Sequence, residues 1–397
     1  MTSHTQGDLT LDLKWTRNRV AHTEHYFCPG FNFWRDLFPD TPLYDFLKDP
    51  SSTPSSHVLI PGQGMPLRHE KKIYTLSWDN LRRGAPTMHA GRFYPQGLLK
   101  GIPDVYPETL LPFRCLETSP HGFVADLNAP MADVTATLDI AVRTLDPGSM
   151  DRERGGQVKD WLRRLMDGPG IQSRYQDRPT QFTDPPGLKR RDESADALFY
   201  DRERRVHHLD ANARRRLSLF YQELVTPGPH VLDLMAGWDS HLPPDMGLAQ
   251  VHGVGLNAGE MEANPALTGH TVQDLNQNPT LEFKAHAFDL ALCSLSVEYL
   301  LDPVALFREV ARVLRPGGTF ALAVSNRWFP DKAIGLWADL HDFERMGYIL
   351  ECFHLSRAFH QLTTLSQRGY PRPEDDPHAP GISLSDPLYI VTGKTKE

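Results

Sequence analysis

The sequence predicts an α/β protein in two parts: a C-terminal doubly wound sheet with an antiparallel last strand, and an N-terminal α+β domain. From about residue 195, short apolar runs alternate with longer helical patterns, as in a parallel sheet with crossover helices. Residues 91–145 combine turns, a proline-rich loop and alternating strand patterns, which is typical of antiparallel strands. The 397 residues also exceed the length of one ordinary domain. We expect an N-terminal domain over 1–150, a linker with one short helix over 151–195 and a C-terminal domain over 196–397.

The first elements of the C-terminal half follow one another in a regular order. Each strand is a short apolar run, and each is followed by polar or glycine-containing loop residues. The stretch AGWDSH, which follows the first strand, reads as a turn and the start of a helix. The expected elements are a helix over 211–225, a strand HVLDLM ending near Asp233, a strand over 251–257, a helix around 259–262, a short strand ending at Asp274 and a strand over 288–296.

The next helix is amphipathic. Val304, Phe307, Val310, Ala311 and Leu314 recur at helical spacing on one face. The helix is expected to stop at the Arg-Pro-Gly-Gly stretch over 315–318, because proline cannot continue a helix and glycine relieves the turn. The remaining elements are predicted as a strand over 319–326, a helix over 328–347, a strand over 347–355 and a last strand over 386–395.

Composition limits the partners. The formal net charge of −8 argues against binding to nucleic acid, whose partners usually carry a basic surface. No window has the roughly 20 apolar residues of a membrane span, and the start MTSHTQGDL does not resemble a signal peptide. The four cysteines are far apart and form no CxxC pair, which favours packing roles in a reducing compartment. We therefore expect a cytoplasmic protein without membrane or nucleic-acid partners, whose oligomeric state stays open.

Four stretches of the C-terminal half carry a family resemblance. HVLDLMAGWDSH (230–241), VGLNAGEM (254–261), VQDL (272–275) and the long run over 288–318 occur in the order found in class I S-adenosylmethionine-dependent methyltransferases. Residues 195–397 resemble this family, which implies a Rossmann-like sheet, S-adenosylmethionine as cofactor and a site in the loops at the carboxyl ends of the strands.

The resemblance implies a set of cofactor-binding residues and shows departures from the family pattern. The family has an acid followed by three alternating glycines, whereas here Asp233 is followed by Met235, Gly237 and Asp239. Asn257 stands where the family usually has an acid that binds the ribose, and Glu260 could help. Ser240 and His241 could bind the methionine carboxylate through backbone donors at the expected helix start. The cofactor-binding candidates are Asp233, Met235, Gly237, Ser240, Asn257, Asp274, Leu275 and Ser294.

A closer resemblance, to a subgroup of methyltransferase-like proteins, points to the acceptor side of the site. The subgroup carries the Trp-x-Ser-His-Leu-Pro stretch found here at 238–243, a Ser-Asn-Arg stretch found at 325–327, and upstream Phe-Tyr and His-hydrophobic-Asp segments found at 199–200 and 208–210. Tyr200, His208 and His241 are the candidates for taking a proton from the acceptor, although packing or structural hydrogen bonding is an alternative for each. The substrate-binding candidates are Trp238, Tyr299, Asn326 and Arg327, the last of which could equally form a surface ion pair.

Methyl transfer is an in-line displacement at an activated methyl group, so the protein chiefly aligns the acceptor and excludes water, and no metal is needed. Aromatic residues near the strand ends suggest a small, partly apolar pocket. We expect a small-molecule acceptor, with a small thiol or sulfide as the leading candidate and a carboxylate or phenol behind it. The alternatives are an O- or N-methyltransferase of a small metabolite or of a protein, and a chaperone or binding module whose methyltransferase domain is not catalytic.

The N-terminal half carries a shorter resemblance. The segment GFVADLNAPMADVTATLDIAV (122–142) resembles the closing strands of FKBP-type peptidyl-prolyl isomerases, with Asp126, Asn128, Pro130 and Ala132 matching but Ala129 and Asp133 differing. The match implies an FKBP-like fold without implying isomerase activity. The aromatic residues over 10–45 predict a packing strap across either domain, with a substrate lid as the alternative, and 50–56 a flexible loop. The strap candidates are Trp15, Tyr26, Phe27, Phe31, Phe33, Trp34 and Phe38.

Overall fold

The computed structural model of the chain describes residues 6–33, 36–37, 42–47, 54–146, 161–182, 188–225, 228–244 and 247–396. The chain divides into two compact units. Unit 1 comprises Met1–Asn18, His22–Asp184 and Phe343–Tyr348, and unit 2 comprises Arg19–Ala21, Pro185–Asp342 and Ile349–Glu397. Of the expected linker, residues 161–182 fall in unit 1 and 188–195 in unit 2, whereas 147–160 and 183–187 lie outside the described residues.

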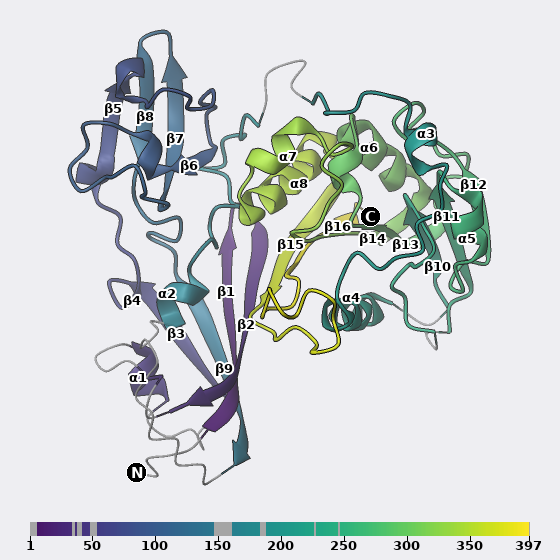
Figure 1. Cartoon of the computed structure of the whole chain (residues 1–397), viewed down its shortest axis with the longest axis horizontal. Helices are drawn as coiled ribbons and strands as arrows, with labels where there is room; N and C mark the ends of the chain where they lie inside the picture. Colours follow the sequence, from purple (N-terminus) through teal and green to yellow (C-terminus); the bar gives the residue numbers. More distant parts are fainter. Residues whose placement is uncertain are drawn as a thin grey trace. The chain divides into compact units, whose positions relative to one another are not determined.

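Unit 2 is a methyltransferase-like α/β fold around a mixed sheet, as the alternating sequence pattern predicts (Figure 1). Its strands lie in the order β12-β11-β10-β13-β14-β16-β15, the first five parallel and β16 antiparallel to both neighbours. The strands are β10 (His230–Leu234), β11 (Gln250–Gly255), β12 (Gly269–Val272), β13 (Phe288–Ser294), β14 (Leu314–Val324), β15 (Phe359–Arg368) and β16 (Leu388–Thr395). The helices are α3 (Asp196–Tyr200), α4 (Ala211–Leu224), α5 (Ala258–Glu262), α6 (Pro303–Val313), α7 (Gly335–Asp339) and α8 (Asp342–Ser356), with a 3₁₀ turn at Val297–Tyr299. Residues 343–348 of α8 are counted with unit 1.

The central strands are buried on both faces. Side chains alternate along a strand, so Ala321 and Ala323 of β14 face one side and Phe320 faces the other. The alanines belong to a core that includes Leu217 of α4. The Phe320 ring lies 5.0 Å from Phe307 of α6. Helices therefore cover both faces of a doubly wound sheet, and strand order reverses between β10 and β13.

Two predicted elements of unit 2 are wrong. Residues 347–355, expected as a strand, belong to α8, because Phe343, Met346, Leu350 and Phe353 recur every three or four residues and are all buried. The neighbouring strand is instead β15, whose inward positions include the hydroxyl residues Thr364 and Ser366, so its apolar alternation is weak. The stretch over 315–318 lies inside β14 rather than in a turn before it.

The expected helix start after β10 is also wrong. Residues 235–244 and 247–249, the described part of this loop, contain no helix. Met235 and His241 have φ values of 55° and 57°, which lie outside the right-handed helical region. Pro243 and Pro244 remove two backbone donors that a helix would use.

Unit 1 is built from antiparallel strands in two groups (Figure 1). One group runs β2-β1-β9-β3-β4, formed by Val20–Asn32, Gln6–Arg17, Ala136–Asp146, Ser55–Pro61 and the short Gly64–Met65, which pairs with β3 in parallel. The other runs β5-β8-β7-β6, formed by Ile73–Ser77, Gly122–Asp126, Pro112–Ser119 and Phe93–Pro95. Short helices occur at Pro42–Phe46 (α1) and Trp161–Leu165 (α2), with 3₁₀ turns at Glu70–Lys72, Trp78–Asn80 and Gln96–Leu98.

The aromatic strap expected over 10–45 is wrong, because this segment supplies the long strands β1 and β2. Leu9, Leu11, Leu13 and Trp15 alternate inward along β1 and are buried, and Phe31 of β2 joins the same core. Trp34 and Phe38 lie outside the described residues, as do 48–53 of the neighbouring loop, whereas 55–56 begin β3.

The antiparallel pattern predicted within 91–145 is present as the β7–β8 and β1–β9 pairings. The two strands of the FKBP-like segment, β8 and β9, lie in different groups of strands, and the FKBP-like fold stays a prediction. No helix among the described residues is long and apolar enough to cross a membrane.

Candidate active site

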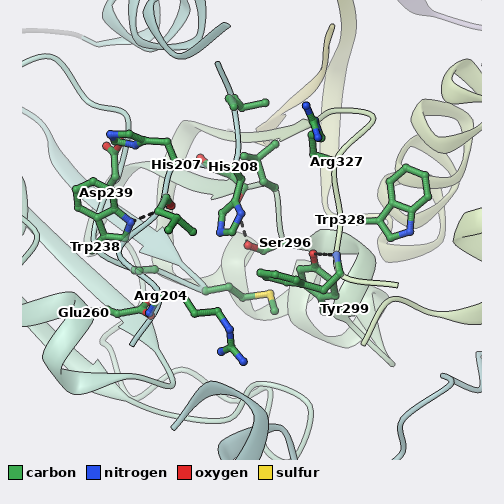
Figure 2. A pocket seen from close by; sticks show the side chains of 18 of the residues that line it. Arg204, His207, His208, Trp238, Asp239, Glu260, Ser296, Tyr299, Arg327 and Trp328 are labelled. Carbon is green, nitrogen blue, oxygen red and sulfur yellow. Dashed lines mark hydrogen bonds and ion pairs between the residues drawn. The ribbon is translucent and has the colours of Figure 1, made fainter. Parts of the chain in front are cut away.

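A cavity of about 690 Å³ lies at the carboxyl ends of the parallel strands of unit 2 (Figure 2). Its wall includes residues that follow β10, β11, β12, β13 and β14, together with the segment before α4 and part of the loop before β16. Ligands of open α/β sheets bind at this edge, where the strand order reverses. The volume falls within the range of about 300–1,000 Å³ that small-molecule sites occupy.

Nearly all the predicted site residues line this cavity, although they come from six separate parts of the chain. The exception is Ser240, whose side chain is buried behind the cavity wall. The lining candidates are Tyr200, His208, Asp233, Met235, Gly237, Trp238, His241, Asn257, Asp274, Leu275, Ser294, Tyr299, Asn326 and Arg327.

The loop after β10 keeps a tight path although two of the family's three glycines are missing. Met235 adopts the left-handed conformation, which costs a non-glycine residue about 1–2 kcal/mol. A Cβ atom at Gly237 would lie 3.1 Å from Oε2 of Glu260, so a larger residue there would require the Glu260 side chain to shift slightly. At the third position, the Asp239 carboxylate accepts a hydrogen bond of 2.8 Å from the backbone N–H of His241 and stabilises the turn.

Asp233 anchors the same loop from below. The Ser240 hydroxyl donates to its carboxylate at 2.6 Å, and Asn264 donates to both the Ser240 hydroxyl and the Gly237 carbonyl oxygen at 2.9 Å. Burial raises the pKa of Asp233 to about 7, while the Ser240 hydrogen bond acts in the opposite direction. The Ser240 hydroxyl thus supports the loop, whereas the role of the Ser240 backbone N–H in binding the methionine carboxylate stays a prediction.

The two polar side chains after β11 and β12 are partly engaged by the protein itself. The Asn257 side chain donates to the carbonyl oxygens of Tyr200 and Asp201 at 2.8 and 3.2 Å and accepts from the Glu260 N–H at 2.9 Å. The Asp274 carboxylate accepts from the Asn276 N–H and the Gln277 side chain, both at 2.9 Å, which stabilises the turn after β12. Each carboxylate oxygen accepts up to two hydrogen bonds, so Asp274 can also accept from a ligand.

His208 also lines the cavity, and it lies on the segment whose Val206 carbonyl oxygen accepts a hydrogen bond of 3.2 Å from the Trp238 indole N–H in the loop after β10. The His208 ring is accessible within the cavity and makes an edge contact with the Phe329 ring at 5.1 Å. Burial among surrounding protein lowers the pKa of His208 below its ordinary value of 6.5, and His241 and His207 act in the same direction. His208 is therefore neutral at pH 7 and can accept a proton.

The tyrosines of the cavity have a different chemical character. The Tyr200 hydroxyl is buried and has no hydrogen-bond partner among the described residues, and burial raises its pKa above the ordinary value of 10.0. Burial also raises the pKa of Tyr299 well above that value, and its hydroxyl oxygen accepts from the Phe329 N–H at 2.9 Å. Both side chains remain phenols at neutral pH. Tyr200 is suited to donating a hydrogen bond, not to the proton-accepting role for which the sequence made it a candidate.

His241 shares a carboxylate with a second histidine. Nδ1 of His241 and Nδ1 of His207 each lie 3.2 Å from Oδ2 of Asp239, and the His207 ring packs on Trp238 at 4.5 Å (Figure 2). Burial acts to raise the pKa of Asp239, but the hydrogen bonds and charges of His241 and His207 outweigh it and lower the pKa to about 2. Of the two predicted histidines, His208 has the ring without an ion-pair partner among the described residues.

Arg327 belongs to a network that the sequence did not reveal. Its Nε donates to Oδ1 of Asp386 at 3.2 Å, and the buried Arg372 donates to the same oxygen at 2.5 Å. The Asp386 N–H in turn donates to Asp210, the residue that caps α4. The members are separated by up to 176 residues, so no local spacing could have indicated them. The neighbouring Asn326 accepts from the Ser325 hydroxyl at 3.3 Å.

Comparison with known proteins agrees with this arrangement. Residues 236–322 match the family model described as a methyltransferase domain. This part of the chain is an S-adenosylmethionine-dependent methyltransferase domain. The chain is also 24% identical over 192 residues to the demethylmenaquinone methyltransferase of Lactiplantibacillus plantarum, a match that covers 43% of this chain and 81% of that protein.

Two solved structures are similar to the methyltransferase domain at lower identity. The YcgJ protein from Bacillus subtilis is 17% identical, with 47% of this chain and 99% of that chain covered and a TM-score of 0.32. An S-adenosylmethionine-dependent methyltransferase from Mesorhizobium loti is 15% identical, with 46% and 97% covered and a TM-score of 0.29. Scores of this size add nothing to the functional argument.

The cavity residues fit S-adenosylmethionine, the cofactor of the methyltransferase domain. Gly237 leaves the wall of the cofactor loop without a Cβ atom, which permits a close approach of a ligand to the backbone. The Glu260 and Asp274 carboxylates, after β11 and β12, can accept from hydroxyl and amino groups of an adenosine. The cofactor supplies an activated methyl group when it is bound.

Proposed function

We propose that the protein transfers the methyl group of S-adenosylmethionine to a small acceptor whose proton is taken by His208. The observation that carries the proposal is the His208 ring, which lines the same cavity as Glu260, Asp274 and the loop around Gly237 and forms no ion pair among the described residues. A base is most effective when its pKa lies near the working pH and it can reach the reacting proton. The cavity volume of about 690 Å³ supports a small acceptor rather than a macromolecule.

The cofactor would be held by the loops after β10, β11, β12 and β13. Asp274 and the backbone of Leu275 would bind the adenine, and Asp233 would act indirectly by supporting the loop through Ser240. Met235, Gly237, Asn257 and Ser294 complete this side of the cavity. These assignments leave the acceptor side to the segment around His208 and the residues after β14.

On the acceptor side, the protein's main task is alignment and exclusion of water. The rings of Tyr200, Tyr299 and Phe329 form an apolar wall around His208, and Trp238 closes the side next to His207. Within this wall, His208 would take the proton of the acceptor. His241, Asn326 and Arg327 would shape the rim of the same space.

A small thiol is the leading acceptor, because its ordinary pKa of about 8.5 lies close enough to the pKa of a protonated imidazole for proton transfer from the thiol to His208. The aromatic wall favours a phenol as the second candidate, and the similarity to a demethylmenaquinone methyltransferase is compatible with an aromatic acceptor. The test is a panel of small thiols, phenols, amines and carboxylates incubated with S-adenosylmethionine, with S-adenosylhomocysteine as the measured product. Methylation of a thiol would support the leading candidate. Methylation of a phenol, an amine or a carboxylate without methylation of any thiol would rule out a thiol as the acceptor.

Asp274 provides a test of the cofactor site that does not depend on the acceptor. We expect Asp274→Ala to weaken S-adenosylhomocysteine binding about 10- to 100-fold, because a hydrogen bond to a charged group is worth about 1.5–3 kcal/mol. Asp274→Asn keeps an acceptor for the Asn276 N–H and separates the loss of charge from the loss of the turn. Isothermal titration calorimetry measures both variants, and unchanged affinity in Asp274→Ala would contradict the assignment.

Unit 1 has a separate proposed role. Its antiparallel strands and the matching residues Asp126 and Asn128 support an FKBP-like fold that acts as a binding module for the methyltransferase domain's substrate, which could then be a protein. The same calorimetry distinguishes a catalytic from a non-catalytic domain. Wild-type protein that is folded but binds neither S-adenosylmethionine nor S-adenosylhomocysteine would favour the binding module alone.

A further inference from the structure

Arg327, in the segment after β14, has hydrogen-bond donors that the protein does not use. Its Nε donates to Oδ1 of Asp386 at 3.2 Å, and its terminal nitrogens Nη1 and Nη2 have no hydrogen-bond partner among the described residues. The side chain is 32% exposed and lines the cavity (Figure 2). Most N–H donors of a guanidinium lie on these two nitrogens, so a complete edge of the group is available to a ligand.

Arg372, the second arginine at Asp386, has no such free edge. Its Nε donates to the Leu384 carbonyl oxygen at 3.1 Å, and Nη1 and Nη2 donate to Asp376 at 3.1 Å and to Asp386 at 2.5 Å. The Arg372 side chain is only 2% exposed. Arg372 thus holds Asp386 in place, and Arg327 is the member of this pair of arginines that can bind a ligand.

Asp386 also connects Arg327 to the segment that carries His208. Oδ2 of Asp386 accepts from the Asp210 N–H at 2.9 Å, and the Asp386 N–H donates to the Asp210 carboxylate at 2.6 Å. His208 precedes Asp210 by two residues, which span at most about 7 Å of chain. A group bound at Nη1 and Nη2 of Arg327 would therefore lie on the acceptor side of the cavity, near enough to belong to a small molecule that also reaches His208.

The surrounding carboxyl groups favour a carboxylate over a phosphate at this place. Burial acts to raise the pKa of Asp386, but the hydrogen bonds from Arg372 and the Asp210 N–H outweigh it and lower that pKa. The hydrogen bond from the His378 N–H lowers the pKa of Asp376, which also lines the cavity. Both carboxyl groups are ionised at neutral pH, and they would repel a doubly charged phosphate more strongly than a singly charged carboxylate.

We propose that the acceptor carries a carboxylate, separate from the atom that is methylated, which Nη1 and Nη2 of Arg327 bind as a bidentate pair. The inference rests on the proposed function, because it assumes that the acceptor lies beside His208. A bidentate pair fixes the orientation of the carboxylate as well as its position, so it aligns the acceptor for the in-line displacement. Arg327 is thereby a specificity-determining residue, and its pair with Asp386 holds the guanidinium in position.

The experiment compares acceptors that differ only in this group. The probes are a thiol pair, 3-mercaptopropionate and 3-mercaptopropionamide, and a phenol pair, 4-hydroxyphenylacetate and 4-hydroxyphenylacetamide. In the pair that it methylates, the wild-type protein is expected to prefer the carboxylate about 10- to 100-fold in kcat/KM, the usual effect of a charge-assisted hydrogen bond. Mass spectrometry should locate the new methyl group on the sulfur or the phenol oxygen and not on the carboxylate.

Arg327→Met removes the donors but keeps the apolar stem, and Asp386 stays paired with Arg372, so the fold is expected to persist. We expect this variant to lose most of the preference for the carboxylate, to methylate the amide at close to the wild-type rate and to bind S-adenosylhomocysteine unchanged. Arg327→Lys, which lacks the planar fork, should retain only part of the preference. Arg308→Met changes an exposed arginine of α6 that does not line the cavity and should behave like the wild-type protein.

Three results would overturn the inference and leave the proposed function intact. They are equal use of both members of the methylated pair by the wild-type protein, a methyl ester as the product, and an equal loss of both activities in Arg327→Met. Methylation of neither pair by a wild-type protein that binds S-adenosylhomocysteine would also overturn the inference. Failure of the folded wild-type protein to bind S-adenosylhomocysteine would instead overturn the proposed function and this inference with it.

Discussion

Replacing His208 by alanine is expected to lower the kcat for methyl transfer about 10²- to 10⁴-fold, the usual contribution of a general base. The acceptor must lose its proton as the methyl group arrives, and the exposed His208 ring lines the cavity without an ion pair among the described residues, whereas His207 and His241 both pair with Asp239. The affinity for S-adenosylhomocysteine should change little, because the cofactor residues lie on other loops. Steady-state kinetics and calorimetry on the same preparation separate these two effects.

Two comparisons strengthen this test. His230→Ala changes a histidine at the start of β10, the opposite end from the cavity, and should leave kcat unchanged. Added imidazole should restore part of the activity of His208→Ala, which a purely structural role would not allow. A variant with wild-type kcat on the physiological acceptor would remove His208 from the mechanism.

The pH dependence of kcat follows from the same residue. Burial lowers the pKa of His208 below 6.5, so the neutral, proton-accepting form predominates at pH 7 and is lost only as the pH falls through this lowered value. We expect kcat to be level near neutral pH and to decrease on the acid side, with a midpoint below 6.5. The decrease should be absent from the residual activity of His208→Ala. A midpoint above 6.5 would contradict the assignment of the acid limb to this residue.

The sequence predicted the methyltransferase domain best where local pattern and topology act together. β10 and β13 are covered on both faces and are therefore almost continuously apolar. α6 buries one face, so its apolar residues recur at helical spacing. Parallel strands bring their carboxyl ends to one edge, and the residues after each strand therefore meet although they are far apart in the sequence. This is why Asp274 and Asn326 could be predicted to line one cavity, whereas His208, which precedes α4, was predicted from the family resemblance.

Spacing in the sequence cannot show contacts that side chains make with distant segments. Asn257 is predicted to bind the ribose and lines the cavity, but its amide nitrogen also donates to backbone carbonyl groups more than 50 residues earlier. Ser240 was assigned to a helix start, but its hydroxyl is needed by Asp233 beneath the loop. Neither partner can be deduced from spacing. The sequence did not predict β15 as a strand, because threonine and serine occupy inward positions where a strand usually has apolar residues.

A buried lysine next to the cavity carries the second large prediction. The Lys332 side chain is 0% exposed, and its ammonium group lies 3.0 Å from Asp192 and 3.4 Å from Asp196. It also donates to the Ser194 carbonyl oxygen at 2.7 Å. Asp196 is paired with Arg190 as well, and Asn276 donates to it at 2.9 Å. The cluster therefore connects α3 and the residues before it to the segment after β14. Tyr200 belongs to α3, and Phe329 belongs to the segment after β14.

We expect Lys332→Met to lower the free energy of unfolding of the methyltransferase domain by about 3 kcal/mol, since removing one partner of a buried ion pair typically costs about 3–5 kcal/mol. Methionine keeps most of the apolar stem, so the loss reports the missing charge and hydrogen bonds and not an empty space. The remaining Arg190–Asp196 pair places the expected value at the lower end of that range. Denaturant unfolding monitored by tryptophan fluorescence gives the change, provided that the denaturant dependence is the same in both proteins.

The matched control is an ion pair in the same unit that water reaches. Arg205 pairs with Glu203 at 2.8 Å, but the two side chains are 52% and 46% exposed. Solvent screens such a pair, so Arg205→Met should change the stability by less than about 1 kcal/mol. If Lys332→Met were no more destabilising than Arg205→Met, the Lys332 cluster would be open to solvent and could not hold Tyr200 and Phe329 in place. A large loss for Lys332→Met alone would show that the acceptor wall depends on a buried charge that contacts neither substrate nor cofactor.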